Sequence, residues 1–151
     1  MSVLFGDVPK ESGRVLVNGE EVEIRQPYEA IRHGIGLLPE DRKAKGLLLD
    51  KSVLANITLS SLKKYCKLGV IGSKREKQSV EGYVKSLQIK TPGTSQQAQF
   101  LSGGNQQKLI VAKWLDMDSD ILIFDEPTRG IDVGAKFEIY QLMHQLVENG
   151  N

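Results

Sequence analysis

The 151-residue chain contains 40% hydrophobic and 26% charged residues, a composition typical of a globular domain. Its net charge of +1 gives no general attraction to nucleic acid or to an anionic membrane, and its longest apolar runs are far too short to span a bilayer. The single cysteine excludes an internal disulfide framework. Because no signal-peptide pattern opens the chain, we expect it to be cytoplasmic.

Strand and helix signals alternate in the first part of the chain. Arg14–Val17 predicts a strand, and Asn18-Gly19 predicts a tight turn after it. Pro27 fits the first position of a short helix that Gly34 ends. Ile35–Leu38 then predicts a short apolar strand. This order is typical of an α/β frame.

The middle of the chain has helix signals instead. Ser52 is placed to cap a helix that runs towards Tyr65, and Ser73 and Glu76 have the spacing of a capping box. Apolar side chains then recur at helical spacing until Pro92, namely Val80, Tyr83, Val84 and Leu87. We expect no strand between these two helices, which predicts an inserted helical subdomain.

The last third returns to the α/β pattern. Ile121–Phe124 is an unbroken apolar run, as expected of a parallel strand covered on both faces. A helical stripe follows, which Gly150 is placed to end, formed by Ile139, Leu142, Met143, Leu146 and Val147. We predict that the whole chain is one incomplete domain, with α/β core pieces at residues 1–50 and 101–151 and a helical subdomain at about 51–100. We expect both ends to be cut from a larger protein.

The stretch "ILIFDEPTRGID" places two carboxylates at the end of the predicted strand. At the carboxyl end of a parallel strand, where α/β proteins bind ligands, Asp125 could hold Mg²⁺ through its water shell. Glu126 could orient or deprotonate a water that attacks a phosphoryl group. The alternative is a strand that ends in a solvated acidic turn.

The stretch "LSGGNQQK" opens a predicted helix with a serine and two glycines. Glycines let a backbone approach a ligand closely, and the start of a helix supplies free N–H groups and a positive dipole end. Ser102 can add a hydroxyl donor. The alternative is an ordinary serine-capped helix with a glycine hinge.

The two stretches together, 23 residues apart from Ser102 to Asp125, resemble the ATP-binding cassette ATPases. The match covers their signature sequence, their Walker B strand and, as "RGID", their D-loop with Asp132. With "PEDRKAKGL" upstream and "DEPTRGIDVGAK" downstream, the chain looks like the second, carboxyl-terminal cassette of the tandem ATPases that energise bacterial importers of ribose, galactose or xylose. The resemblance implies a partial P-loop NTPase fold with a mostly parallel sheet.

The resemblance also implies roles for individual residues. Glu126 would be the catalytic base and Asp125 would hold Mg²⁺, while Glu40 stands at the Q-loop position, where most cassettes have glutamine. In this family the signature contacts the ATP that the opposite cassette holds. The residues implied in this trans-acting contact are Ser102, Gly103, Gly104, Asn105 and Gln106.

Half of a phosphate site is missing from the chain. No stretch matches the phosphate loop G-x-x-x-x-G-K-S/T, and Gly69–Lys74 has the wrong spacing for it. A switch histidine is also missing, since His33 and His144 fall in predicted helices and read as solvated. We therefore expect the chain alone to bind MgATP weakly or not at all.

Family resemblance implies several partners. These are the amino-terminal cassette of the same full-length protein, transmembrane permease subunits and, indirectly, a periplasmic or extracellular sugar-binding protein. The segment at roughly Glu40–Cys66 would face the permease, which places the protein on the inner face of the cell membrane. Within it, Leu47–Leu49 suits either a docking surface or the core.

Two other functions fit the same motifs. One is a cassette ATPase that does not transport and acts on ribosomes or DNA ends; the near-neutral charge argues against it, and we expect no nucleic-acid partner. The other is a non-catalytic assembly module. Lys63, Lys64 and Lys67 form either a basic patch or a solvated helix face.

Overall fold

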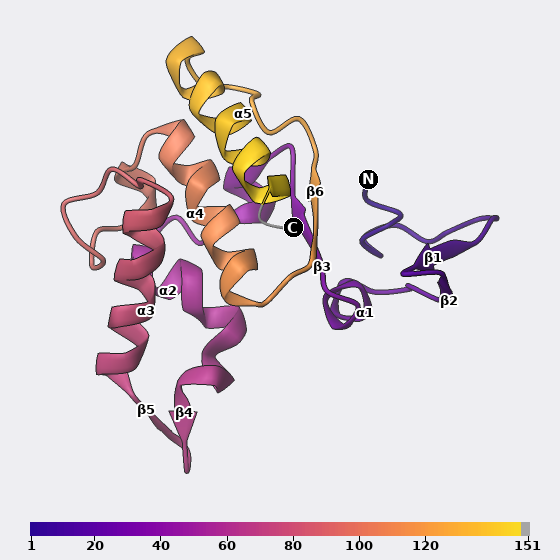
Figure 1. The fold of residues 1–151 in the computed structure, drawn as a ribbon, viewed down its shortest axis with the longest axis horizontal. Coiled ribbons are helices and arrows are strands. Elements are labelled where there is room, and N and C mark those ends of the chain that lie inside the picture. Colours follow the sequence, from indigo (N-terminus) through magenta and orange to yellow (C-terminus); the bar gives the residue numbers. More distant parts are fainter. Residues whose placement is uncertain (149–151) are drawn as a thin grey trace.

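The computed structural model describes residues 1–148, and its first elements follow the sequence-based prediction (Figure 1). Strands β1 (Val15–Val17) and β2 (Glu20–Val22) form an antiparallel hairpin. Its turn is Asn18-Gly19, whose φ angles of 53° and 84° confirm the predicted tight turn. Helix α1 (Pro27–Arg32) starts at Pro27, and Gly34 follows it with a φ of 71°.

Two strands far apart in the sequence form the parallel pair beside the helices. β3 (Ile35–Leu38) pairs with β6 (Ile121–Phe124), with Ile35 opposite Ile121 and Leu38 opposite Phe124. β3 is buried throughout, but Ile121 is 37% exposed. The prediction that β6 is covered on both faces is therefore wrong, because Ile121 is exposed and the other three residues of β6 are only half-buried.

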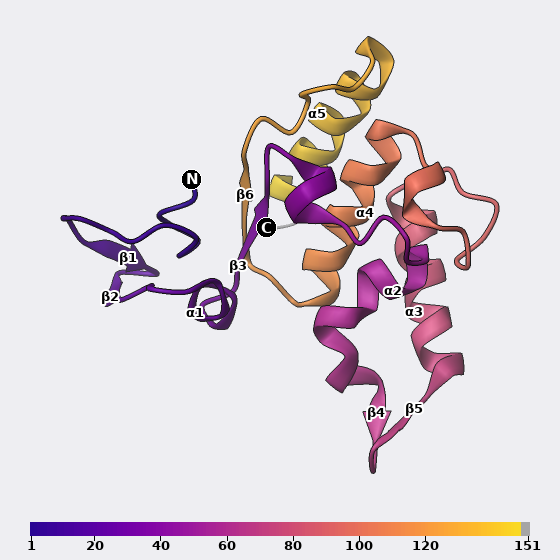
Figure 2. The same cartoon turned by 180° about the vertical axis from the view of Figure 1, so that it is seen from behind.

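Helix α4 (Gly103–Asp116) is the centre of the core. It packs against α2 (Val53–Thr58), α5 (Val133–Glu148) and β3, and Figures 1 and 2 show it between the other helices. Trp114 is buried, and its Nε1 donates to the carbonyl oxygen of Leu37 at 2.8 Å. Gly36 is required beneath this ring, since a Cβ there would lie 2.8 Å from it.

The middle of the chain is helical, but less regular than predicted. Ser52 caps α2 (Val53–Thr58) as predicted, accepting from the Ala55 N–H at 3.1 Å. The prediction of one helix up to Tyr65 is wrong, because a 3₁₀ segment, Leu59–Tyr65, follows α2. The Thr58 hydroxyl oxygen lies 3.0 Å from the Leu54 carbonyl oxygen of the preceding turn, and its single hydrogen is shared between this carbonyl and the Glu76 carboxylate.

A short hairpin corrects a second prediction. β4 (Cys66–Lys67) and β5 (Val70–Ile71) pair across a two-residue turn, where no strand was expected. α3 (Ser73–Ser86) then starts after Gly72, and the predicted capping box is absent. Its glutamate, Glu76, is buried and accepts from the Thr58 hydroxyl at 2.7 Å instead of capping the helix.

Helix α5 (Val133–Glu148) completes the described chain. Ile139, Leu142 and Leu146 are buried as the predicted stripe requires, whereas Val147 is 70% exposed. Gly150, the predicted end of this helix, lies outside the described residues. None of the helices within residues 1–148 is both long enough and apolar enough to cross a membrane.

A buried carboxylate anchors the end of α4 to the helical segment. Asp116 is 1% exposed and accepts from the hydroxyls of Ser61 and Tyr65. The Tyr65 hydroxyl also bonds Ser79 of α3 at 3.0 Å. Burial, followed by the bond to Asp116, raises the pKa of Tyr65 to about 12. This cluster therefore joins three helical elements through polar contacts.

Lys113, one residue before Trp114, lies against the core without a carboxylate partner among the described residues. Its Nζ donates to the carbonyl oxygen of Gly46 at 3.0 Å and lies 4.7 Å from the centre of the Trp114 ring. Burial lowers the pKa of Lys113 from 10.5 to about 8, because the charged form is desolvated. Folding therefore favours loss of its proton.

We predict that the lowered pKa of Lys113 makes the free energy of unfolding rise with pH. Between about pH 8 and 10.5 the unfolded chain binds more protons at this lysine than the folded chain, so stability increases with pH across that window. Urea unfolding at several pH values checks this in the parent and in Lys113→Met. The rise should be absent in Lys113→Met, and parallel pH profiles would contradict it.

Candidate functional site

The acidic pair lies where β6 ends. The Asp125 N–H donates to the carbonyl oxygen of Leu38 at 3.0 Å, which extends the β3–β6 ladder by one bond. The Asp125 side chain is half-buried. Glu126 is exposed and has a left-handed φ of 46°, a conformation that is costly for a residue with a side chain. The chain therefore turns sharply at the residue predicted to be the base.

Glu40 lies at the same edge of the sheet, two residues after β3. Its carboxylate forms an ion pair with the guanidinium of Arg129, whose Nη1 also lies 4.0 Å from the Glu126 carboxylate. One arginine therefore separates the carboxylates at the Q-loop and base positions. A cleft opens here, lined by Glu40, Asp41, Arg42, Lys43, Arg129 and Gly130.

The signature residues, Ser102–Gln106, start α4. Ser102 is exposed and caps the helix, its Oγ accepting from the Asn105 backbone N–H at 3.5 Å and from the Asn105 side-chain amide at 2.8 Å. Asn105 also accepts from the Lys90 N–H at 2.8 Å. Gln106 donates to the Ala98 carbonyl oxygen at 3.1 Å and is buried. The amides of Asn105 and Gln106 thus serve the fold, and Ser102 faces outward.

Both signature glycines lie in close packing. A Cβ on Gly103 would lie 2.7 Å from Ile131 and 2.8 Å from the Arg42 guanidinium. A Cβ on Gly104 would lie 2.8 Å from the side chain of Ala135 in α5. Close approach of chain segments therefore explains these glycines in addition to the predicted close approach of a ligand.

Arg42 is the residue that the sequence reasoning missed. Its Nε donates to Gln106 Oε1 at 3.1 Å, Nη1 to the Arg129 carbonyl oxygen at 3.0 Å and Nη2 to that of Gly130 at 3.3 Å. The planar fork of a guanidinium is suited to several acceptors at once. An arginine in the charged turn "PEDRKAKG" indicates a possible site residue, but the sequence does not show its partners, which lie 64 to 88 residues away.

The remaining predicted site residues have identifiable surroundings. Asp132 accepts from the Ala135 N–H at 2.9 Å, which caps the start of α5. Gln107 donates to the Pro127 carbonyl oxygen at 2.7 Å and so ties α4 to the loop after the acidic pair. His33 and His144 are both exposed, as predicted.

The donor set constrains which metal would fit. Within residues 1–148 no group of three or more His, Cys, Asp or Glu side chains gathers as a metal cage. Asp125 offers one half-buried residue with a carboxylate at the end of β6. Mg²⁺ is commonly bound by one or two carboxylates with phosphate oxygens and water, so this donor set fits Mg²⁺ that arrives with a nucleotide.

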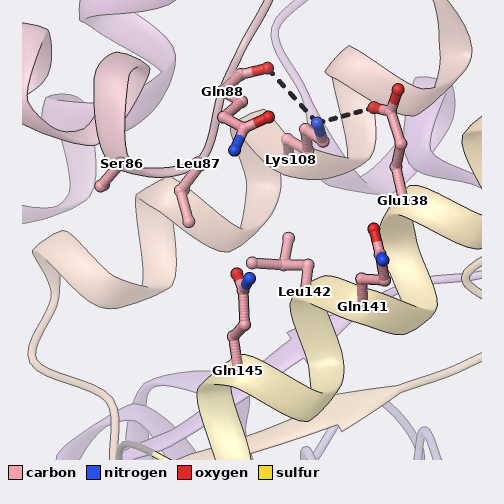
Figure 3. A pocket seen from close by; sticks show the side chains of 8 residues that line it. All are labelled: Ser86, Leu87, Gln88, Lys108, Glu138, Gln141, Leu142 and Gln145. Atoms are coloured by element: carbon pink, nitrogen blue, oxygen red, sulfur yellow. Dashed lines mark hydrogen bonds and ion pairs between the residues drawn. The ribbon is translucent and has the colours of Figure 1, made fainter.

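A second, smaller pocket lies between the end of α3, α4 and α5 (Figure 3). Lys108 crosses it, donating to Glu138 at 2.8 Å and to the Gln88 carbonyl oxygen at 3.3 Å. The hydrogen bond and charge of Lys108 lower the pKa of Glu138. The open space beside this ion pair is only about 50 Å³, so we interpret the pocket as a contact between helices.

Solved structures share the fold of this chain. A nucleotide-free ATP-binding cassette from an ABC transporter superposes with a TM-score of 0.77 at 19% identity, covering 99% of this chain and 60% of that one. A dimeric post-hydrolysis cassette bound to ADP and Pi gives 0.75 at 19% identity, covering 99% and 64%. The fold is that of an ATP-binding cassette, as predicted.

Sequence comparison gives the family. The sequence model described as ABC transporter matches residues 1–129, and the chain belongs to this family. The chain is 46% identical to a ribose import ATP-binding protein of Bacillus cereus, over 100% of this chain and 30% of the relative. It is 47% identical to the corresponding protein of Halalkalibacterium halodurans, over 99% and 30%. It therefore spans about a third of these relatives' length.

We predict that Arg42 stabilises the site through the hydrogen bonds that its three guanidinium nitrogens donate. Arg42→Ala should lower the free energy of unfolding by about 2–3 kcal/mol, since it leaves three acceptors without their donor. Arg42→Lys keeps the charge but not the fork, and should recover less than half of the loss.

Urea unfolding measures both variants, with Arg32→Lys, at an exposed residue of α1, as the matched control. An Arg42→Lys protein as stable as the parent would contradict the role of the fork.

Proposed function

We propose that the chain is part of the ATP-binding subunit of a bacterial monosaccharide importer, where it couples ATP hydrolysis to sugar uptake. Family membership and relatives whose names describe ribose import support this function. The observation that carries it is structural: Arg42 bonds the start of α4 to the loop that follows the acidic pair, so both phosphate-handling motifs share one edge.

The signature residues and the acidic pair act on two different nucleotides. Ser102 is exposed at the start of α4, where the helix dipole favours an anion, so it suits ATP held by an opposite cassette. The partner is the amino-terminal cassette of the same full-length protein. Asn105 and Gln106 hold the start of α4 in position, since their amides are bonded within the chain.

The acidic pair serves a phosphate group at the strand end. Glu126 is exposed and orients or deprotonates the attacking water, and the left-handed turn at this residue sets the direction of its carboxylate. Asp125 would hold Mg²⁺, which neutralises phosphate charge when bound. The Arg129 guanidinium, paired with Glu40, places a positive charge between the carboxylates.

A groove between the segment Ala44–Leu48 and helix α2 is the candidate binding surface for the permease. It is lined by Ala44, Leu48, Ala55, Leu59 and Lys113 among others, with a volume of about 270 Å³. Leu47 is buried while Leu48 is 44% exposed, so the apolar triplet is divided between core and groove. Permease binding here would place the protein on the inner face of the membrane, with a sugar-binding protein on the far side.

We predict that Glu126→Gln lowers ATP hydrolysis by about 10²-fold or more in a two-cassette protein that carries this segment, while ATP binding is kept. Removal of a positioned base slows the chemical step without removing phosphate contacts. Single-turnover phosphate release measures the step, with Glu21→Gln on β2 as the exposed control.

Ser102→Ala in the same protein should lower turnover through the opposite nucleotide, by about tenfold or more. Full-rate hydrolysis by both variants would contradict the proposed catalytic role and favour a non-catalytic assembly module.

A further inference from the structure

The loop of the β4–β5 hairpin carries an unusual residue for its backbone conformation. Its two loop residues, Leu68 and Gly69, have φ angles of 51° and 81°. Two-residue hairpin loops with positive φ at both positions favour Asn-Gly, because a larger side chain is strained there. Leu68 bears this strain and is 97% exposed, so no burial within the chain compensates for it.

Apolar exposure continues along the adjoining strand. Val70 is 71% and Ile71 42% exposed, and the Cys66 side chain opposite is also exposed. Figures 1 and 2 show this hairpin projecting from the far end of the helical segment, away from the parallel strand pair. The molecule therefore ends here in a small apolar tip.

Positive charge surrounds this tip. From Leu59 to Arg75 the chain has five cations and no carboxylate, against a net charge of +1 for all 151 residues. Lys64 is paired with Asp118, but no ion pair within residues 1–148 involves the other four: Lys63, Lys67, Lys74 and Arg75. All four of these side chains are exposed.

We propose that the β4–β5 hairpin binds an anionic lipid surface, inserting Leu68 and Val70 among the headgroups while the surrounding lysines contact lipid phosphates. Apolar insertion and cationic attraction together are the two signals that give stable interfacial binding. A single-stranded nucleic acid fits less well, because stacking requires aromatic side chains and the nearby Tyr65 is buried. The inference does not require ATP binding or a permease.

Vesicle sedimentation of the 151-residue chain tests the proposal, using phosphatidylcholine vesicles with and without phosphatidylglycerol. The chain should bind the anionic vesicles only, and high salt should release it. Lys63→Gln/Lys67→Gln should weaken binding about 25-fold, at about fivefold per charge. Lys85→Gln/Lys136→Gln, which removes two exposed lysines elsewhere, should bind as the parent does.

The variant Leu68→Asn separates an effect on membrane insertion from an effect on folding stability. Asparagine suits the left-handed turn, so this variant should be at least as stable to urea as the parent, yet bind vesicles about tenfold more weakly. Glu126→Gln should bind vesicles normally, which keeps this test independent of the ATP site.

Three results would overturn the proposal. These are no binding to anionic vesicles, equal loss of binding in the two double-lysine variants, or capture by single-stranded RNA in preference to vesicles.

Discussion

The guanidinium of Arg42 holds together the parts on which the candidate site depends. It donates to Gln106 at the start of α4 and to the carbonyl oxygens of Arg129 and Gly130, which follow the acidic pair. Gly103 must lack a side chain for this contact, because a Cβ would lie 2.8 Å from the guanidinium. The Arg42 contact therefore requires glycine at a position 61 residues away in the sequence (103 − 42 = 61).

Helix α4 transmits this constraint to the rest of the molecule. Its start is fixed by Arg42 and by close packing on Ala135, and its other end is fixed by Trp114 and Asp116. The Asp116 carboxylate binds hydroxyls of the helical segment, so one buried helix joins that segment to the exposed Ser102. A buried polar cluster of this kind fixes orientation more strictly than apolar contacts, because each bond has a direction.

The sequence predicted the elements whose signals are local. Pro27 and Gly34 bound α1, Ser52 caps α2, and the run ending at Phe124 forms a parallel strand. Predictions failed where a contact with a distant residue determines the role of a side chain. Glu76, for example, accepts from the Thr58 hydroxyl instead of capping its own helix. The motifs located the acidic pair and Ser102, but Arg42 was missed because all its partners lie far away in the sequence and two of the three are backbone carbonyls, which no residue pattern marks.

The proposal that the signature acts on a nucleotide held elsewhere is tested most directly by calorimetric titration of MgATP. The titration compares this chain with the same chain preceded by a lysine-bearing phosphate loop. We expect saturable binding only with the loop, since Asn105 and Gln106 are bonded within the chain and Ser102 faces outward. Equal submillimolar binding by the unmodified chain would contradict the proposal and place a phosphate site among the residues described.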